Sequence, residues 1–127
     1  MGPVGHVVYV DDDEVMQVMM EHWLRRQGYR VSAFADPLVA LQALRAAPMD
    51  FDVVVTDFNM PGMSGLALAE VLAVLRPDLP VVISSGYVSE DLRESARRCG
   101  VREVIHKADG TAQLGALLQR LLGDTPS

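Results

Sequence analysis

Short apolar runs alternate with longer amphipathic segments along the chain, and this alternation constrains the fold more than any other feature. The apolar runs predict five strands, at residues 6–10, 29–34, 51–57, 80–85 and 101–106. The amphipathic segments predict five helices, at residues 14–28, 36–47, 65–76, 89–99 and 111–122. Because each strand is followed by a helix, we expect an α/β fold with a parallel sheet covered by helices on both faces.

Composition limits the chain to one ordinary domain. It has 127 residues, of which half are apolar, and this is enough to form a core at about residues 6–122 with flexible ends at 1–5 and 123–127. The net charge of −6 argues against a nucleic-acid surface. We expect no membrane contact, because no apolar run approaches about 18 residues. A single cysteine, Cys99, favours a cytoplasmic location.

Polar side chains gather at the predicted strand ends, where parallel sheets bind their ligands. They are Asp11, Asp12 and Asp13 after the first strand, Asp57 and Asn59 after the third, Ser84 and Ser85 at the end of the fourth, and Lys107 after the fifth. Lys107 is the one lysine among eleven basic residues. Lysine is a compact charge on a flexible stem, and it enters a narrow acidic pocket more easily than the wide fork of arginine.

One aspartate after a strand is explained by helix capping, but three in succession exceed what a cap requires. Carboxylates brought together from two strands repel one another unless a cation lies between them. Mg²⁺ suits such a site, since it binds a few carboxylates and keeps several waters. Aspartate can also accept a phosphoryl group, and that transfer needs mainly positioning and neutralisation of charge.

Four stretches, VVYVDDDE, VVVTDFNMPGMSG, PVVISSGY and VIHK, resemble the receiver (response-regulator) family of two-component signalling. The resemblance covers about residues 6–122 and implies a flavodoxin-like, doubly wound, five-stranded parallel sheet of order 2-1-3-4-5 in a three-layer αβα arrangement. It implies that Asp57 is the phosphoacceptor, Ser85 the switch hydroxyl and Lys107 the family's lysine.

The resemblance also implies a Mg²⁺ site. Asp12 would bind the ion directly, together with Asp57, and Asp11 would bind it through water. Asn59 would contribute its backbone carbonyl. Asp13 is expected to be a helix cap.

The chain departs from the family pattern at three positions. Ala108 replaces the usual proline after the lysine, so we expect a trans peptide and a rearranged loop at residues 109–110. Val104 replaces the aromatic residue that reports switching in the family. Tyr87, two residues past Ser85, is placed where it could shield an aspartyl-phosphate from water and lengthen its life.

The resemblance implies a phosphoacceptor signalling domain that takes a phosphoryl group from a histidine kinase or a histidine phosphotransfer protein. Such a domain catalyses its own phosphorylation and slow dephosphorylation and then shifts between two conformations. A pseudo-receiver, which binds partners without phosphorylation, is the alternative. We expect either a stand-alone monomer or weak dimer, or the C-terminal receiver of a hybrid histidine kinase. An aspartate-nucleophile phosphohydrolase is disfavoured, because that class has aspartate where Asn59 lies.

Overall fold

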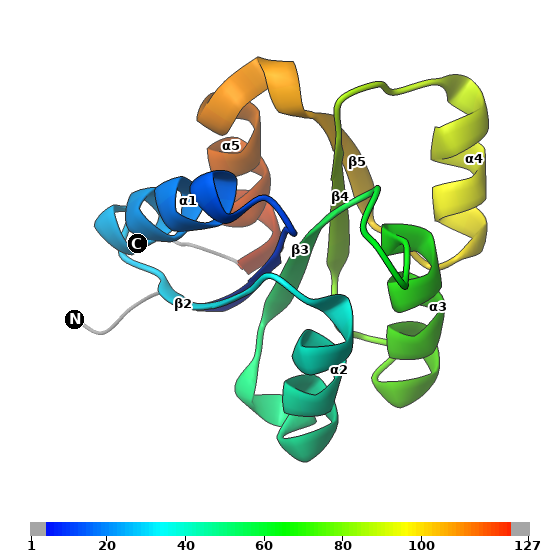
Figure 1. Ribbon diagram of the computed structural model, residues 1–127, viewed down its shortest axis with the longest axis horizontal. Helices are drawn as coiled ribbons and strands as arrows, with labels where there is room; N and C mark the ends of the chain where they lie inside the picture. The colour runs from blue at the N-terminus through cyan, green and yellow to red at the C-terminus, as the bar shows by residue number, and fades with distance from the viewer. Residues whose placement is uncertain (1–4, 123–127) are drawn as a thin grey trace.

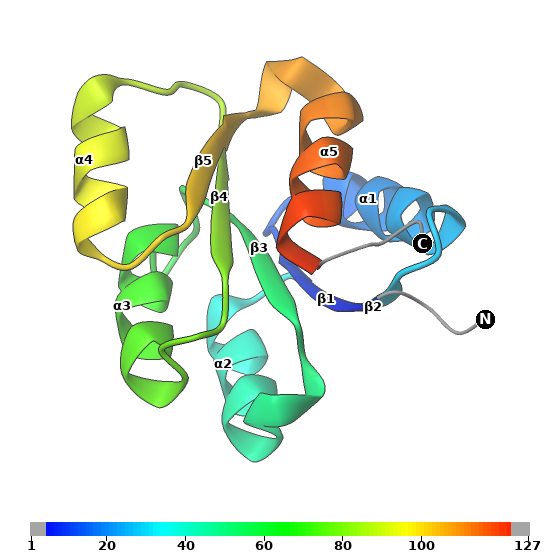
Figure 2. The ribbon, with the colours of Figure 1, turned by 180° about the vertical axis from the view of Figure 1, so that it is seen from behind.

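The computed structural model describes residues 5–122, and the expected flexible ends at 1–5 and 123–127 lie outside this range except for Gly5. Five parallel strands form one sheet of order β2-β1-β3-β4-β5. Helices α1 and α5 cover one face of the sheet, and α2, α3 and α4 cover the other (Figures 1 and 2). The elements are β1 His6–Val10, α1 Glu14–Arg26, β2 Arg30–Phe34, α2 Pro37–Ala46, β3 Val53–Asp57, α3 Gly65–Leu75, β4 Val81–Ser85, α4 Glu90–Arg98, β5 Glu103–His106 and α5 Gly110–Leu122. The predicted flavodoxin-like fold is confirmed.

Side chains alternate between two cores, one on each face of the sheet. In β1, Val7 and Tyr9 pack on the α1 and α5 side, whereas Val8 and Val10 pack on the α2, α3 and α4 side. Burying apolar area on both faces explains why the strands are continuous apolar runs rather than alternating polar ones. The same alternation decides which polar groups share a face at the strand ends.

Helix caps fix the loops that carry the polar residues. Asp13 accepts hydrogen bonds from the N–H groups of Val15 and Met16, so its expected role as a cap is confirmed. Ser64 caps α3 by accepting a hydrogen bond from the Ala67 N–H. These caps satisfy N–H groups that the first turn of a helix leaves without partners, and they anchor the loops after β1 and β3.

Some local features differ from the expectations. β5 begins at Glu103 rather than at residue 101, because the Val101 N–H closes the end of α4 by bonding to the Ala96 carbonyl. Two 3₁₀ turns, Pro48–Asp50 and Lys107–Asp109, were not predicted. None of the described helices is both long enough and apolar enough to cross a membrane.

Candidate functional site

Three carboxylates meet at the carboxyl edge of the sheet. Asp11 and Asp12 follow β1, and Asp57 ends the adjacent strand β3. Each offers an oxygen, and these three oxygens lie within 4.8 Å of one another. The β1–β3 register, in which Val10 pairs with Thr56, brings Asp11 level with Asp57. The expected cluster therefore forms from strand pairing, with Asp11 and Asp57 buried and Asp12 exposed.

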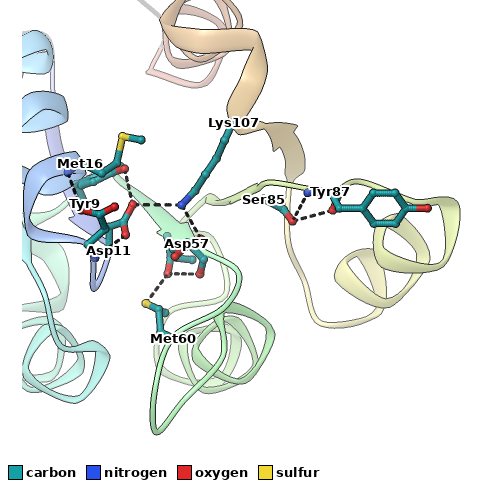
Figure 3. Close-up of polar contacts among 10 residues, drawn as sticks. Tyr9, Asp11, Met16, Asp57, Met60, Ser85, Tyr87 and Lys107 are labelled. Atoms are coloured by element: carbon teal, nitrogen blue, oxygen red, sulfur yellow. Dashed lines mark hydrogen bonds and ion pairs between the residues drawn. The ribbon is translucent and has the colours of Figure 1, made fainter.

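Lys107 reaches into this cluster from the end of β5. Its Nζ lies 3.1 Å from Oδ1 of Asp57 and 3.5 Å from Oδ2 of Asp11 (Figure 3). The residues described contain no cis peptide, so the trans bond expected at Ala108 is confirmed. The Ala108 N–H, which a proline would lack, donates to Nδ1 of His106 at 3.0 Å. Replacing the proline therefore leaves Lys107 in place.

The pKa shifts at this site share one direction. Burial raises the pKa of Asp57 above its ordinary value of 3.8, although its hydrogen bond to Lys107 and that residue's charge oppose the rise. Burial lowers the pKa of Lys107, but the bond to Asp57 and the charges of Asp11 and Asp57 outweigh it, so the pKa lies above 10.5. Both groups hold a proton more tightly than usual. Three carboxylates lie near one ammonium, so the site carries an excess of negative charge even with Lys107 in place.

Tyr9 is a residue of this site that the sequence analysis missed. Its hydroxyl donates to Oδ2 of Asp11 at 3.0 Å, and its side chain is buried (Figure 3). Burial, and then the charge of Asp11, raise the pKa of the phenol, so it remains a neutral donor. The signal was present in the sequence: two residues apart on one strand, Tyr9 and Asp11 share a face.

The loop after Asp57 approaches the strand closely because α3 begins with a glycine. A Cβ at Gly65 would lie 2.6 Å from the Asp57 carbonyl oxygen, and the Gly65 N–H bonds to the Phe58 carbonyl at 2.9 Å. A side chain at this position would push the α3 end of the loop away from Asp57. Asn59 lies on the same loop and is exposed.

Ser85 does not contact the acidic cluster in this conformation. Its Oγ donates to the Tyr87 carbonyl at 2.7 Å and accepts from the Tyr87 N–H at 3.2 Å. The Tyr87 ring is 77% exposed and points away from Asp57 (Figure 3). Tyr87 therefore leaves Asp57 unshielded here, and its expected effect on phosphate lifetime stays a prediction.

The donor set of the cluster fits Mg²⁺. Three carboxylate oxygens from two adjacent strands are hard ligands, and the exposure of Asp12 leaves one side of the cluster open to water. Three carboxylates and one ammonium leave this cluster with an excess of negative charge, which favours binding of a divalent cation. Asp11, Asp12 and Asp57 could hold such an ion.

Residues 7–119 match the family model of the response regulator receiver domain. The chain is a receiver domain of the response-regulator family. It is 33% identical over 119 residues to the putative two-component response regulator ARR21 of Arabidopsis thaliana, covering 94% of this chain but only 19% of that protein's length. The receiver domain thus spans a small part of this curated relative.

Solved structures share the fold of this receiver domain. A response regulator receiver domain protein from Clostridium thermocellum superposes with a TM-score of 0.88 at 21% identity, covering 94% of this chain and 95% of that one. The receiver domain of the sensor histidine kinase PA1611 from Pseudomonas aeruginosa superposes with a TM-score of 0.83 at 24% identity, covering 97% and 99%. That structure has a magnesium ion coordinated in its active-site cleft.

Proposed function

We propose that this receiver domain is a Mg²⁺-dependent phosphoacceptor in a two-component phosphorelay, with Asp57 as the acceptor. The observation that carries the proposal is the convergence of Asp11, Asp12, Asp57 and Lys107 at one edge of the sheet. The family to which the chain belongs is a signalling family, and the donor is proposed to be a phosphohistidine on a histidine kinase or a phosphotransfer protein.

The proposed step transfers one phosphoryl group. A carboxylate oxygen of Asp57 forms a bond to phosphorus, the nitrogen–phosphorus bond of the phosphohistidine breaks, and the imidazole leaves with the electron pair and takes up a proton. Lys107, 3.1 Å from Asp57 Oδ1, neutralises charge on the phosphoryl oxygens. Mg²⁺, when bound by the three carboxylates, supplies further neutralisation of charge on these oxygens. Ser85 and the Asn59 carbonyl are proposed to complete the site, as switch hydroxyl and metal ligand.

The proposal is tested by incubating the protein with acetyl phosphate and Mg²⁺ and separating the products on a phosphate-affinity gel. We expect a retarded band for the wild type and none for Asp57→Asn. Asp91→Asn, a change of the same chemical kind on the exposed face of α4, is the matched control and should be phosphorylated normally.

Titration with Mg²⁺ and beryllofluoride separates the proposed function from the pseudo-receiver alternative. A phosphoacceptor binds Mg²⁺ and then beryllofluoride, which stands in for the phosphoryl group. A wild type that binds neither and gives no retarded band at saturating acetyl phosphate would be a pseudo-receiver, and the proposed function would be wrong.

A further inference from the structure

Tyr9 provides a donor whose position is fixed by packing. Its ring is 3% exposed and belongs to the core between the sheet and helices α1 and α5, with Leu24 and Leu114. Its hydroxyl reaches Oδ2 of Asp11 at 3.0 Å. Asp11 is itself fully buried, so the hydrogen bond between the two buried groups fixes the orientation of the carboxylate.

The hydrogen bonds of Asp11 divide its two oxygens between separate tasks. Oδ2 accepts from the Tyr9 hydroxyl and also faces Lys107 Nζ at 3.5 Å. Oδ1 accepts from the Asp13 N–H at 3.0 Å. Each carboxylate oxygen has about two acceptor directions. Both acceptor directions of Oδ2 are therefore occupied by protein donors. Among the described residues, Oδ1 has one donor, so its second acceptor direction remains open for a metal ion or a metal-bound water.

Tyr9 also affects how Lys107 is shared. Lys107 Nζ lies closer to Asp57 than to Asp11, at 3.1 Å against 3.5 Å. Both the hydroxyl and the ammonium approach the same oxygen of Asp11. With the hydroxyl removed, Oδ2 would have Lys107 as its single donor, and the carboxylate would turn toward the ammonium. Asp11 would then leave the orientation in which Oδ1 accepts from the Asp13 N–H and keeps its second acceptor direction open.

We infer that Tyr9 is a positioning residue for the metal site: its hydroxyl holds Asp11 so that Oδ1 serves Mg²⁺ and Lys107 serves Asp57. The inference rests on the proposed Mg²⁺ site. Removing a group that hydrogen-bonds a metal ligand and so orients it typically lowers metal affinity by about 10–100-fold. Because Asp11 is expected to bind through water, the effect belongs at the lower end, about tenfold.

Tyr9→Phe removes one oxygen atom and leaves the ring in the core. Tyr29→Phe is the matched control. Tyr29 is 6% exposed in the same core, but it precedes β2 and so lies at the amino end of the strands, away from the carboxylates. Mg²⁺ affinity is measured by isothermal titration calorimetry, and circular dichroism verifies the fold. We expect the Kd for Mg²⁺ to rise about tenfold in Tyr9→Phe and to stay within twofold of wild type in Tyr29→Phe.

Phosphorylation kinetics give a second measurement, which would not change if Tyr9 only stabilised the fold. With acetyl phosphate, the Mg²⁺ concentration for half-maximal phosphorylation should rise by the same factor in Tyr9→Phe, while the rate at saturating Mg²⁺ stays within about twofold. A lower unfolding free energy with unchanged Mg²⁺ affinity would overturn the inference and leave the proposed function standing. A wild type that binds no Mg²⁺ would overturn both.

Discussion

Two halves of the sheet's carboxyl edge differ in what their polar groups contact. In one half, Asp11, Asp57 and Lys107 come from β1, β3 and the end of β5, and they contact one another across the sheet. In the other half, the Ser85 hydroxyl at the end of β4 contacts the backbone of Tyr87 in its own loop. The first half is assembled by contacts far apart in sequence, and the second by contacts two residues apart.

Strand phase explains the difference. Val82 packs with α1 and α5, so Ser84 shares a face with Asp57, whereas Ser85 shares the opposite face with Ile83. The acidic half is therefore fixed by strand register, and Ser85 can join it only if its loop moves. For the proposed function, this means that cation binding is preorganised, while contact between Ser85 and a phosphoryl group must break the bonds to Tyr87.

The largest expected effect comes from removing the positive charge of Lys107 from the acidic half of the carboxyl edge. Lys107→Gln should lower the rate of phosphorylation by acetyl phosphate about 100-fold or more, because a donor aimed at developing charge is lost. The rate is measured on the phosphate-affinity gel at saturating Mg²⁺. Arg120→Gln, which removes one positive charge from the exposed face of α5, should leave the rate within twofold.

Lys107→Arg sharpens this test. The guanidinium of arginine keeps the positive charge but is wider than an ammonium. It would have to fit between Asp11 and Asp57, both of which the smaller Lys107 ammonium already contacts. We expect a rate between those of the wild type and Lys107→Gln. A rate equal to that of the wild type would show that charge alone matters at this position and not the shape of the cation.

A smaller effect follows from the pKa of Asp57, which burial raises above 3.8. The folded state then binds a proton at Asp57 more tightly than the unfolded chain does, so stability falls as pH rises from 3.8 through the folded pKa. Without Mg²⁺, Asp57→Asn should exceed the wild type in unfolding free energy at pH 7, by on the order of 1 kcal/mol. The difference should vanish below about pH 3.8, as measured by urea denaturation in EDTA.

Mg²⁺ should reverse this order. A ligand that binds the folded state alone adds about 2.7 kcal/mol of stability at 100 times its Kd, and Asp57→Asn loses one of the three carboxylates that hold the ion. If instead the wild type were the more stable protein in EDTA at pH 7, Lys107 would compensate fully for the burial of Asp57.

The fold and the acidic half could be predicted from the sequence because both follow from regular patterns. Alternating strands and helices define a doubly wound sheet, and the strand ends of such a sheet converge. The cap at Asp13 was predicted from its residue type and its position between a strand and a helix. Lys107 keeps its place without a following proline, and the sequence could not show this because the contact of Ala108 with His106 depends on local loop geometry.

What escaped prediction depends on the direction of a side chain rather than on its position. Tyr9 was taken as one apolar residue of a buried strand, although its phase matches that of Asp11 and its hydroxyl needs a partner. Ser85 was expected at the acidic rim as the switch hydroxyl at the end of the fourth strand, and that role stays a prediction; the bonds of its hydroxyl to the Tyr87 backbone depend on loop geometry. Side-chain alternation along the first strand, applied to its polar residues, would have indicated the contact between Tyr9 and Asp11.

The smallest expected effect tests whether the two halves are independent. Ser85→Ala removes both hydrogen bonds to Tyr87 and leaves the contacts between the carboxylates and Lys107 untouched. We expect the unfolding free energy to fall by about 1 kcal/mol and the Kd for Mg²⁺ to stay within about twofold of wild type. Ser84→Ala is the matched control, an adjacent serine on the other face of the same strand.

The pair of serine variants also decides what phosphorylation does to the loop. Amide hydrogen exchange at Tyr87, measured with and without beryllofluoride, reports whether Ser85 Oγ releases the Tyr87 N–H. In the wild type, beryllofluoride should speed exchange there, because Oγ turns toward the phosphoryl mimic. In Ser85→Ala, exchange should be fast from the start and indifferent to beryllofluoride, whereas Ser84→Ala should follow the wild type. Slow exchange in Ser85→Ala would mean that contacts other than the hydroxyl hold the loop, and the two halves would then be coupled through the backbone.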